Sequence, residues 1–417
     1  MRFLSDLTIS EDFALVILLL VLIVVPRALQ RYRLPGAVTA LVLGFGLHSL
    51  GWVQANPGLN LFSTLGIVAL FLFAGLEING EELRQHRRVL LQHGLLWSAI
   101  LAITAVGAAH TFGLSGRAAT LVALALLTPS TGFILSTLAS SGLSEEERFA
   151  VKTKAIALEL IALGALFFVT QSTSARQLGV SVVAMLAIVL VIPLAFRFFA
   201  AVVLPYAPRS EFAFLLVVAV VSAIITRELG VYYLLGAFLT GIAAQRFRET
   251  LPALSSEKMV DALEAFGSVF IPFYFFVAGM HIDAAQASGW AFALGLALLA
   301  VFVPLRIGFT MWHRRLALSE LLGNSRRVAT SLVPTLVFTL VLAELLRDSF
   351  GGPDFIVGAL IIYAVINTTL PAFILGAPPP TFEALQAPPS PAEEEGFTDS
   401  PGWGAGGGGG GRGGSYR

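Results

Sequence analysis

Long apolar runs are the feature of this sequence that most restricts its fold. Of the 417 residues, 56% are hydrophobic and only 12% are charged. The apolar runs are about 16 to 26 residues long, and an α-helix needs about 20 residues to cross the hydrocarbon core of a bilayer. The runs therefore predict an all-α polytopic membrane protein rather than a soluble domain.

Thirteen of these runs, separated by polar breaks, are predicted to be membrane-spanning helices. They cover residues 11–30, 37–53, 59–78, 89–112, 118–143, 149–171, 178–204, 212–226, 231–245, 261–282, 290–312, 328–346 and 355–375. Together they form a transmembrane domain over 11–376, preceded by a short segment, 1–10. The Pro- and Gly-rich stretch 377–417 is expected to be a disordered cytoplasmic tail, and the sequence identifies no cytosolic regulatory partner for it.

The distribution of positive charge predicts the orientation in the membrane. With the N-terminus outside, 20 of the 26 lysines and arginines fall on the inside and only five on the outside. The positive-inside rule therefore favours an inner-membrane protein with its C-terminus in the cytoplasm. The formal net charge of zero gives no support for nucleic-acid binding, and the absence of cysteine excludes disulfides and thiolate chemistry.

Two of the predicted spans contain a proline and hydroxyl side chains near their middle. In the fifth span, Pro129 stands among Thr128, Ser130 and Thr131. Proline removes a backbone donor and clashes with the preceding turn, so it kinks or breaks a helix. Inside a bilayer the freed backbone groups must be satisfied by protein or by a water-lined cavity, and hydroxyl groups suit that role.

The twelfth span repeats this pattern at Pro334 and Thr335. If the chain is divided into six spans, one linking span and six more, each break falls in the fifth helix of its half. Because the single linking span makes the offset between equivalent helices odd, the second half is inverted in the membrane relative to the first. This arrangement is typical of inverted repeats whose two crossed discontinuous helices hold an ion site near the membrane midplane.

Two ionisable residues lie deep within the predicted spans. Glu159 is near the middle of the sixth span and Arg306 is comparably deep in the eleventh. A charge at the bilayer centre costs about 2.5 to 3.5 kcal/mol on insertion scales, so such residues are usually functional. A carboxylate can hold either a proton or a metal cation, and Glu159 is the predicted ion ligand, with Thr128, Ser130 and Thr131 beside it. The alternative is a structural ion pair with Arg306.

Lys152 and Lys154 precede Glu159 on the same span. Snorkelling to the interface is the favoured interpretation of both, with Lys154 kept as a second candidate charge partner of Glu159. The six histidines are scattered without metal-ligand spacing, and no role is assigned to them.

Three stretches resemble the monovalent cation:proton antiporters of the second cation/proton antiporter family. They read LFSTLGIVALFLFAGLEI at 61–78, LGAFLTG at 235–241 and FYFFVAGMHID at 273–283, and they occur in the family's order. The resemblance extends over about residues 11–376. In the sixth span the family usually carries an aspartate, whereas this chain reads Leu158, Glu159 and Leu160.

The resemblance implies a secondary transporter that exchanges Na⁺ or K⁺ for H⁺ by alternating access. It also implies a core built from residues of about 89–171 and 290–376, with the other helices forming a scaffold that makes a homodimer, and an elevator-like movement of one against the other. No cofactor is implied beyond the transported ions.

Two other functions are weighed against exchange. One is a sodium-coupled organic-solute symporter of related fold, and the other is a non-transporting regulatory relative. An enzyme is disfavoured because the sequence has no His-Glu-x-x-His motif, no paired intramembrane aspartates and no serine–histidine pairing.

Overall fold

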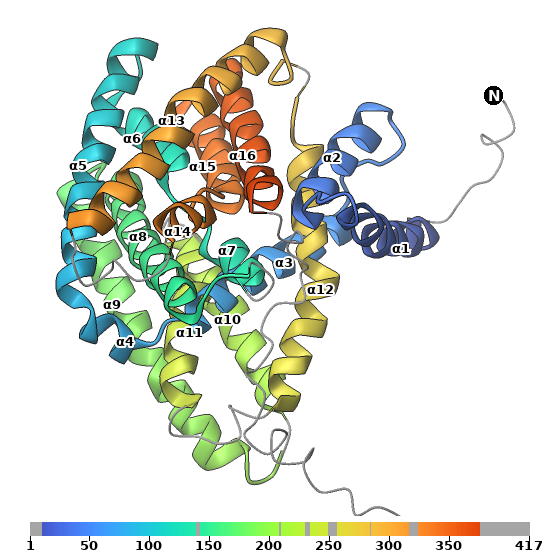
Figure 1. Cartoon of the computed structure of the whole chain (residues 1–417). Coiled ribbons are helices and arrows are strands. Elements are labelled where there is room, and N and C mark those ends of the chain that lie inside the picture. Colours follow the sequence, from blue (N-terminus) through green and yellow to red (C-terminus); the bar gives the residue numbers. More distant parts are fainter. Residues whose placement is uncertain are drawn as a thin grey trace, which may run out of the picture. The chain divides into compact units, whose positions relative to one another are not determined.

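The computed structural model describes residues 11–138, 142–207, 210–229, 234–248, 257–283, 285–316 and 324–375. These residues form α-helices and one π-helical turn, with no strand among them (Figure 1). The elements are α1 (Glu11–Gln30), α2 (Gly36–Ser49), α3 (Pro57–Leu76), α4 (Gly80–Gln85), α5 (Arg87–Phe112), α6 (Gly116–Leu127), α7 (Thr131–Leu138), α8 (Glu145–Gln171), α9 (Ala175–Phe198), η1 (Phe199–Val203), α10 (Glu211–Glu228), α11 (Leu234–Arg248), α12 (Glu257–Met280), α13 (Gly289–Leu316), α14 (Ser325–Ser331), α15 (Leu336–Phe350) and α16 (Asp354–Ile374). The predicted segment 1–10 and the predicted tail 377–417 lie outside the described residues.

Each of the thirteen predicted spans coincides with a helix or with two consecutive helical segments. Nine stretches of the described helices are long and apolar enough to cross a membrane, and α2, α11 and α12 contain shorter apolar segments. The fifth and twelfth spans are each divided, into α6 and α7 and into α14 and α15. The predicted all-α polytopic fold with two discontinuous helices is therefore confirmed.

Local capping explains where several helices begin and end. Helix α8 starts at Glu145, earlier than predicted, because Ser144 and Glu147 form a capping box in which each side chain accepts the other residue's backbone N–H. Helices α5 and α15 are followed by Gly113 and Gly351, both in the left-handed conformation that ends helices. These signals place polar residues outside the apolar spans.

The described helices pack mainly in two groups. Helices α2, α3, α10, α11 and α12 pack on one another, and we call them the scaffold group. Helices α5 to α8 pack with α13 to α16, and we call them the core group. The core group contains both discontinuous helices, so it contains the predicted site residues.

Glycines bring helix backbones of the scaffold group into direct contact. A Cβ added to Gly75 of α3 would lie 2.2 Å from the carbonyl oxygen of Phe238 in α11. A Cβ added to Gly279 of α12 would lie 2.0 Å from the carbonyl oxygen of Leu41 in α2. Such positions admit no side chain without displacing backbone, so these helices are held closely together.

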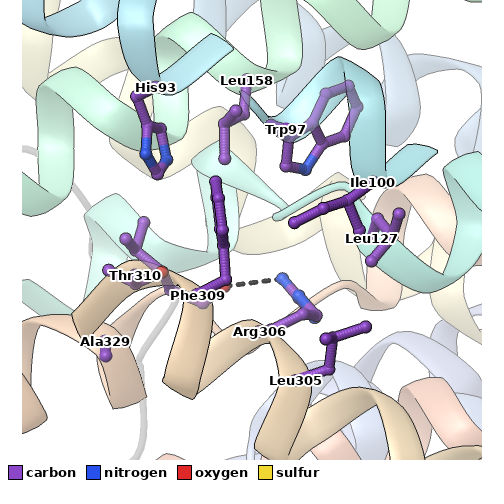
Figure 2. A pocket seen from close by; sticks show the side chains of 11 residues that line it. His93, Trp97, Ile100, Leu127, Leu158, Leu305, Arg306, Phe309, Thr310 and Ala329 are labelled. Atoms are coloured by element: carbon purple, nitrogen blue, oxygen red, sulfur yellow. Dashed lines mark hydrogen bonds between the residues drawn. The ribbon is translucent and has the colours of Figure 1, made fainter. Parts of the chain in front are cut away.

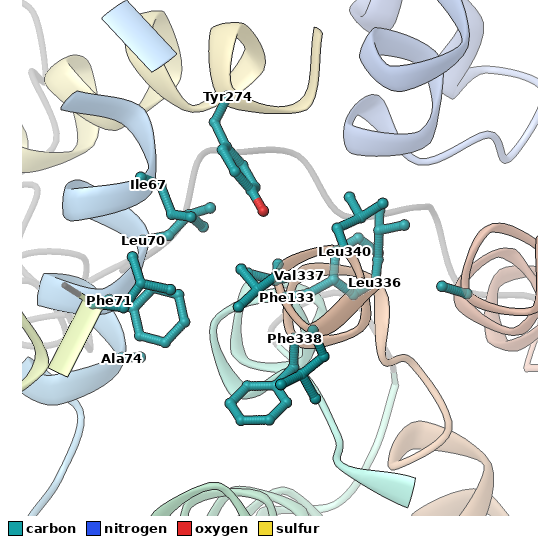
Figure 3. Close-up of a cluster of buried hydrophobic side chains, with 14 of the residues drawn as sticks. Ile67, Leu70, Phe71, Ala74, Phe133, Tyr274, Leu336, Val337, Phe338 and Leu340 are labelled. Atoms are coloured by element: carbon teal, nitrogen blue, oxygen red, sulfur yellow. The ribbon is translucent and has the colours of Figure 1, made fainter. Parts of the chain in front are cut away.

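Helix α3 also faces the core group, through side chains rather than through backbone. The apolar cluster in Figure 3 brings Ile67, Leu70 and Phe71 of α3 together with Phe133 of α7 and Val337 of α15. At Gly132 of α7 an added Cβ would be 3.7 Å from the Leu70 carbonyl oxygen, which is ordinary van der Waals contact. Among the described residues, α3 and the core group therefore meet through apolar side chains, without the close backbone approach found inside the scaffold group.

Candidate functional site

The two helix breaks contact each other directly. Residues Thr128 to Ser130 lie between α6 and α7, and residues Leu332 to Thr335 lie between α14 and α15. The backbone N–H of Ser130 donates a hydrogen bond of 2.8 Å to the carbonyl oxygen of Pro334. Residues about 200 positions apart thus share one backbone hydrogen bond at the crossing, as expected for broken helices that must satisfy their free backbone groups within protein.

Side chains satisfy the remaining backbone groups around the crossing. The Ser130 hydroxyl oxygen accepts from the N–H groups of Val337 and Phe338, at 3.0 and 3.3 Å, and so caps the start of α15. The Tyr363 hydroxyl of α16 donates to the carbonyl oxygen of Leu126, near the end of α6, at 2.7 Å. The hydroxyl of Thr339 donates to the carbonyl of Ala125 at 2.7 Å. Each discontinuous helix is therefore held by groups from the other half.

Glu159 belongs to α8, and its side chain reaches the start of α7. Its Oε2 accepts a hydrogen bond of 3.2 Å from the backbone N–H of Thr131, the first residue of that half-helix. The side chain is buried, at 5% exposure. Helix N-termini attract negative charge, so the carboxylate occupies a favourable position even though it is in the core. The hydroxyl of Thr128 is also buried and has no hydrogen-bond partner among the described residues.

Arg306 lies at the other break. Its guanidinium donates to the carbonyl oxygens of Leu332 and Val333, at 2.7 and 2.6 Å, and lies 3.4 Å from the Tyr363 hydroxyl. These carbonyls end α14, where a helix carries partial negative charge. Within the described part of the chain, Arg306 therefore contacts backbone carbonyls at the second break rather than Glu159, and the structural ion pair considered from the sequence is not formed.

Of the two lysines of α8, Lys154 is buried and departs from the expected snorkelling, whereas Lys152 remains partly exposed. Lys154 is only 1% exposed, and its Nζ lies 3.3 Å from Nδ1 of His313 in α13. Lys152 forms an ion pair of 3.2 Å with Glu77, the residue that follows α3. Each lysine therefore meets a polar group of a neighbouring part of the protein. The structure places Lys154 against α13, whereas Glu159 contacts α7.

A small cavity lies near Arg306 (Figure 2). Its volume is about 20 Å³, enough for about one water molecule. Its wall includes His93 and Trp97 of α5 and Phe309 of α13, with Arg306 on one side. The rings of His93 and His313 approach to 4.5 Å between centroids. A fixed guanidinium on the wall disfavours a cation, so this cavity is not the place where a transported cation would bind.

The structure brings most of the predicted site residues together at the crossing. Around the first break lie Thr128, Pro129, Ser130, Thr131 and Glu159. Around the second lie Pro334, Thr335 and Arg306. Sequence reasoning missed two further polar residues of α16 at this crossing, Tyr363 and Asn367. The polar group of Asn367, Thr368 and Thr369 within a predicted membrane span was the available signal.

Two discontinuous helices, one from each of two inverted repeats, that cross each other are the architecture of a secondary membrane transporter. The chain belongs to the family described as sodium/hydrogen exchanger, transmembrane, whose sequence profile matches residues 15–378. Family membership confirms the resemblance seen in the sequence and the expectation that the protein is a transporter rather than an enzyme.

Three relatives share between 23% and 28% of aligned residues with the chain. The Na⁺/H⁺ antiporter NhaS5 of Synechocystis is 28% identical over 282 residues, which are 64% of this chain and 39% of that protein. The probable Na⁺/H⁺ antiporter 3 of Methanocaldococcus jannaschii is 23% identical, over 66% of this chain and 72% of that one. A Na⁺/H⁺ antiporter of Enterococcus hirae is 24% identical, over 67% of this chain and 76% of that one.

A solved structure has the same fold. The sodium proton antiporter MjNhaP1 from Methanocaldococcus jannaschii superposes with a TM-score of 0.61 at 15% sequence identity. The match covers 88% of this chain and 98% of that one. At this identity the likeness establishes the fold alone.

Proposed function

We propose that the protein exchanges a monovalent cation, Na⁺ or K⁺, for H⁺ across the cell membrane. The observation that carries the proposal is the buried carboxylate of Glu159 at the N-terminus of α7, directly beside the crossing of the discontinuous helices. The family and the printed names of the three relatives support the same class of activity and favour Na⁺ as the first ion to test.

In this proposal the Glu159 carboxylate binds either a proton or the cation, but not both. When the proton leaves, the carboxylate supplies a charged oxygen ligand, and the Thr128 hydroxyl supplies a neutral one that no other described group occupies. Thr131 orients the carboxylate through its backbone N–H, and Ser130 keeps the two breaks together. Competition between the two ions for one group couples their opposite movements.

The cation must reach Glu159 from each side of the membrane in turn. We infer that the core group moves relative to the scaffold group, because the described residues of α3 meet α7 and α15 through apolar side chains, and Gly132 of α7 leaves ordinary van der Waals space to α3. The ion pair between Glu77, which follows α3, and Lys152, on α8, joins the two groups in the described state. Such a pair would have to open or change partners during the movement.

The remaining expectations belong to the same proposal. The N-terminus lies outside and the C-terminus in the cytoplasm, as the distribution of lysine and arginine predicts. The scaffold group provides the contact surface of a homodimer, with the core groups on the outside.

A flux assay with purified protein in proteoliposomes tests the proposal. A pH gradient is set across the vesicle membrane, and Na⁺, K⁺ or Li⁺ is then added to the outside in separate experiments. Exchange predicts that at least one cation dissipates the gradient in a saturable manner. Cation-driven uptake of an organic solute without proton movement would instead indicate a symporter, and no flux of any kind would indicate a regulatory relative; either result contradicts the proposal.

A further inference from the structure

Asn367 is a fully buried polar residue of α16 at the second helix break. Its Oδ1 accepts from the backbone N–H of Thr335 at 3.3 Å and from the hydroxyl of Thr368 at 3.0 Å. Its Nδ2 donates to the hydroxyl of Thr335 at 3.0 Å. The side chain is 0% exposed, so both ends of the amide are satisfied inside the protein.

Asn367 occupies in the second repeat the place that Glu159 occupies in the first. Glu159 lies on the helix that follows α7, and Asn367 lies on the helix that follows α15. Each lies about 20 Å from the N-terminus of its own helix, α8 or α16, at a rise of about 1.5 Å per residue. Each side-chain oxygen accepts a backbone N–H at the start of a half-helix, Thr131 in one case and Thr335 in the other.

The two acceptors also flank the same backbone contact. Thr131 follows Ser130, and Thr335 follows Pro334, and Ser130 and Pro334 share the hydrogen bond that joins the breaks. Glu159 and Asn367 therefore lie on opposite sides of one crossing. Each accepts the backbone N–H of the residue that directly follows the Ser130–Pro334 hydrogen bond in its own half. Their equivalence follows from the inverted repeats and not from their residue types.

The chemical difference between them is charge. A carboxylate can take up a proton, whereas an amide oxygen is a neutral acceptor and cation ligand that does not titrate. Among the described residues, Arg306 contacts this part of α16 through the Tyr363 hydroxyl, and a guanidinium stays protonated in proteins. The second break thus carries no side chain that exchanges protons among the groups described at the crossing.

We propose that Asn367 is the uncharged counterpart of Glu159 and that its neutrality sets the exchange at one proton for each monovalent cation. The inference rests on the proposed exchange function and specifies its charge balance. One proton leaves Glu159 as one monovalent cation arrives, so a complete cycle moves no net charge across the membrane. A carboxylate at position 367 would add a second group able to bind a proton.

The surroundings of Asn367 would accept an aspartate. The Thr335 N–H would still donate to it, and the Thr335 hydroxyl can donate to a carboxylate in place of accepting from the amide. The start of α15 also favours a negative charge. Asn367→Asp is therefore the informative variant, and Asn367→Ser is the matched control that removes the amide without adding charge.

The experiment measures Na⁺-coupled H⁺ flux in proteoliposomes in which the inside-to-outside concentration ratios of Na⁺ and of H⁺ are equal. The two gradients then drive a one-for-one exchanger in opposite directions, and their effects cancel. The voltage is then varied with an ionophore and an ion that the flux assay shows is not transported. Wild type and Asn367→Ser should show no net flux at any voltage. Asn367→Asp should show net flux that reverses with voltage, with the reversal ratio of Na⁺ shifting about tenfold for each ~60 mV per charge moved.

Three results would overturn the inference. One is voltage-dependent net flux in the wild-type protein, a measurement that needs no variant to fold. The second is an active Asn367→Asp protein that stays voltage-independent. The third is a folded but inactive Asn367→Asp protein whose thermal stabilisation by Na⁺ equals that of wild type; greater stabilisation would support a cation trapped by the added carboxylate. Absence of all cation-driven flux in wild type would instead contradict the proposed exchange function.

Discussion

Ser130 and Pro334 join the two discontinuous helices through a single backbone hydrogen bond, and the Ser130 side chain extends that junction by capping α15. Its hydroxyl oxygen accepts from the N–H groups of Val337 and Phe338. Ser130 therefore joins the break between α6 and α7 to the start of α15. The geometry of the Glu159 site depends on this junction, because Thr131 follows Ser130 directly.

Ser130→Ala should lower both stability and exchange. It leaves two buried N–H groups of α15 without an acceptor, which should cost about 1 to 2 kcal/mol of unfolding free energy. Thermal unfolding of the purified protein in detergent measures the effect. Ser98→Ala is the control, because that hydroxyl donates only to Gly94 of its own helix. Equal unfolding temperatures for Ser130→Ala and Ser98→Ala would show that the cap is unimportant.

Arg306→Ala should destabilise the protein because it frees the carbonyl oxygens of Leu332 and Val333 at the end of α14. Hydrogen bonds to charged donors contribute about 1.5 to 3 kcal/mol. Arg306→Lys should recover only part of this, since one ammonium cannot reproduce the fork that reaches both carbonyls. Unfolding temperatures measure the effect, with the exposed Arg315→Ala as control. Wild-type stability of Arg306→Ala would contradict the assigned role.

The pair Glu77–Lys152 should influence the rate of exchange more than stability. Its side chains are 21% and 27% exposed, so the pair contributes about 1 kcal/mol or less in the described state. Glu77→Lys should alter the maximal Na⁺-dependent flux several-fold by disfavouring the state in which the groups are joined. The exchanged pair, Glu77→Lys with Lys152→Glu, should return toward the wild-type rate. Additive effects of the two changes would rule out a direct interaction during transport.

Cysteine labelling tests the orientation, and the chain has no native cysteine to remove. Ala55→Cys is preferable to a change at Asn56, since the Asn56 side chain caps α3. Ala55→Cys should react with an impermeant thiol reagent from outside the cell, and Gln85→Cys should react only after the inner face is made accessible. Both positions are exposed, so accessibility to the reagent depends on sidedness alone. Labelling of both from the same side would contradict the topology.

The sequence predicted the helices and their breaks well because both depend on residues close together along the chain. Span length follows from membrane thickness, and the interruption near Pro129 and Pro334 follows from the missing backbone donor of proline. The depth of Glu159 could likewise be read from its position within an apolar run. Its hydrogen bond to Thr131 joins two neighbouring helices of the first half, which adjacency along the chain already suggested.

The partners of the other polar residues could not be predicted in this way. Arg306 contacts the carbonyls of α14, and Lys154 meets His313, because of how helices from different halves are rotated about their axes. Sequence position gives the depth of a residue in the membrane but not the direction in which its side chain points. The likeness between Asn367 and Glu159 lies in the backbone N–H groups that they accept, and the sequence alone does not give these contacts.

The most direct test of the account is Na⁺-driven H⁺ flux through Glu159→Gln in proteoliposomes. Glutamine keeps the shape and an acceptor for the Thr131 N–H but removes the exchangeable proton. Glu159→Gln should fold and show flux at background level. Glu159→Asp should keep exchange with an altered pH dependence. Glu344→Gln, which changes a carboxyl elsewhere in α15, should exchange at the wild-type rate. Wild-type exchange by Glu159→Gln would contradict the central claim that this carboxylate carries the ions.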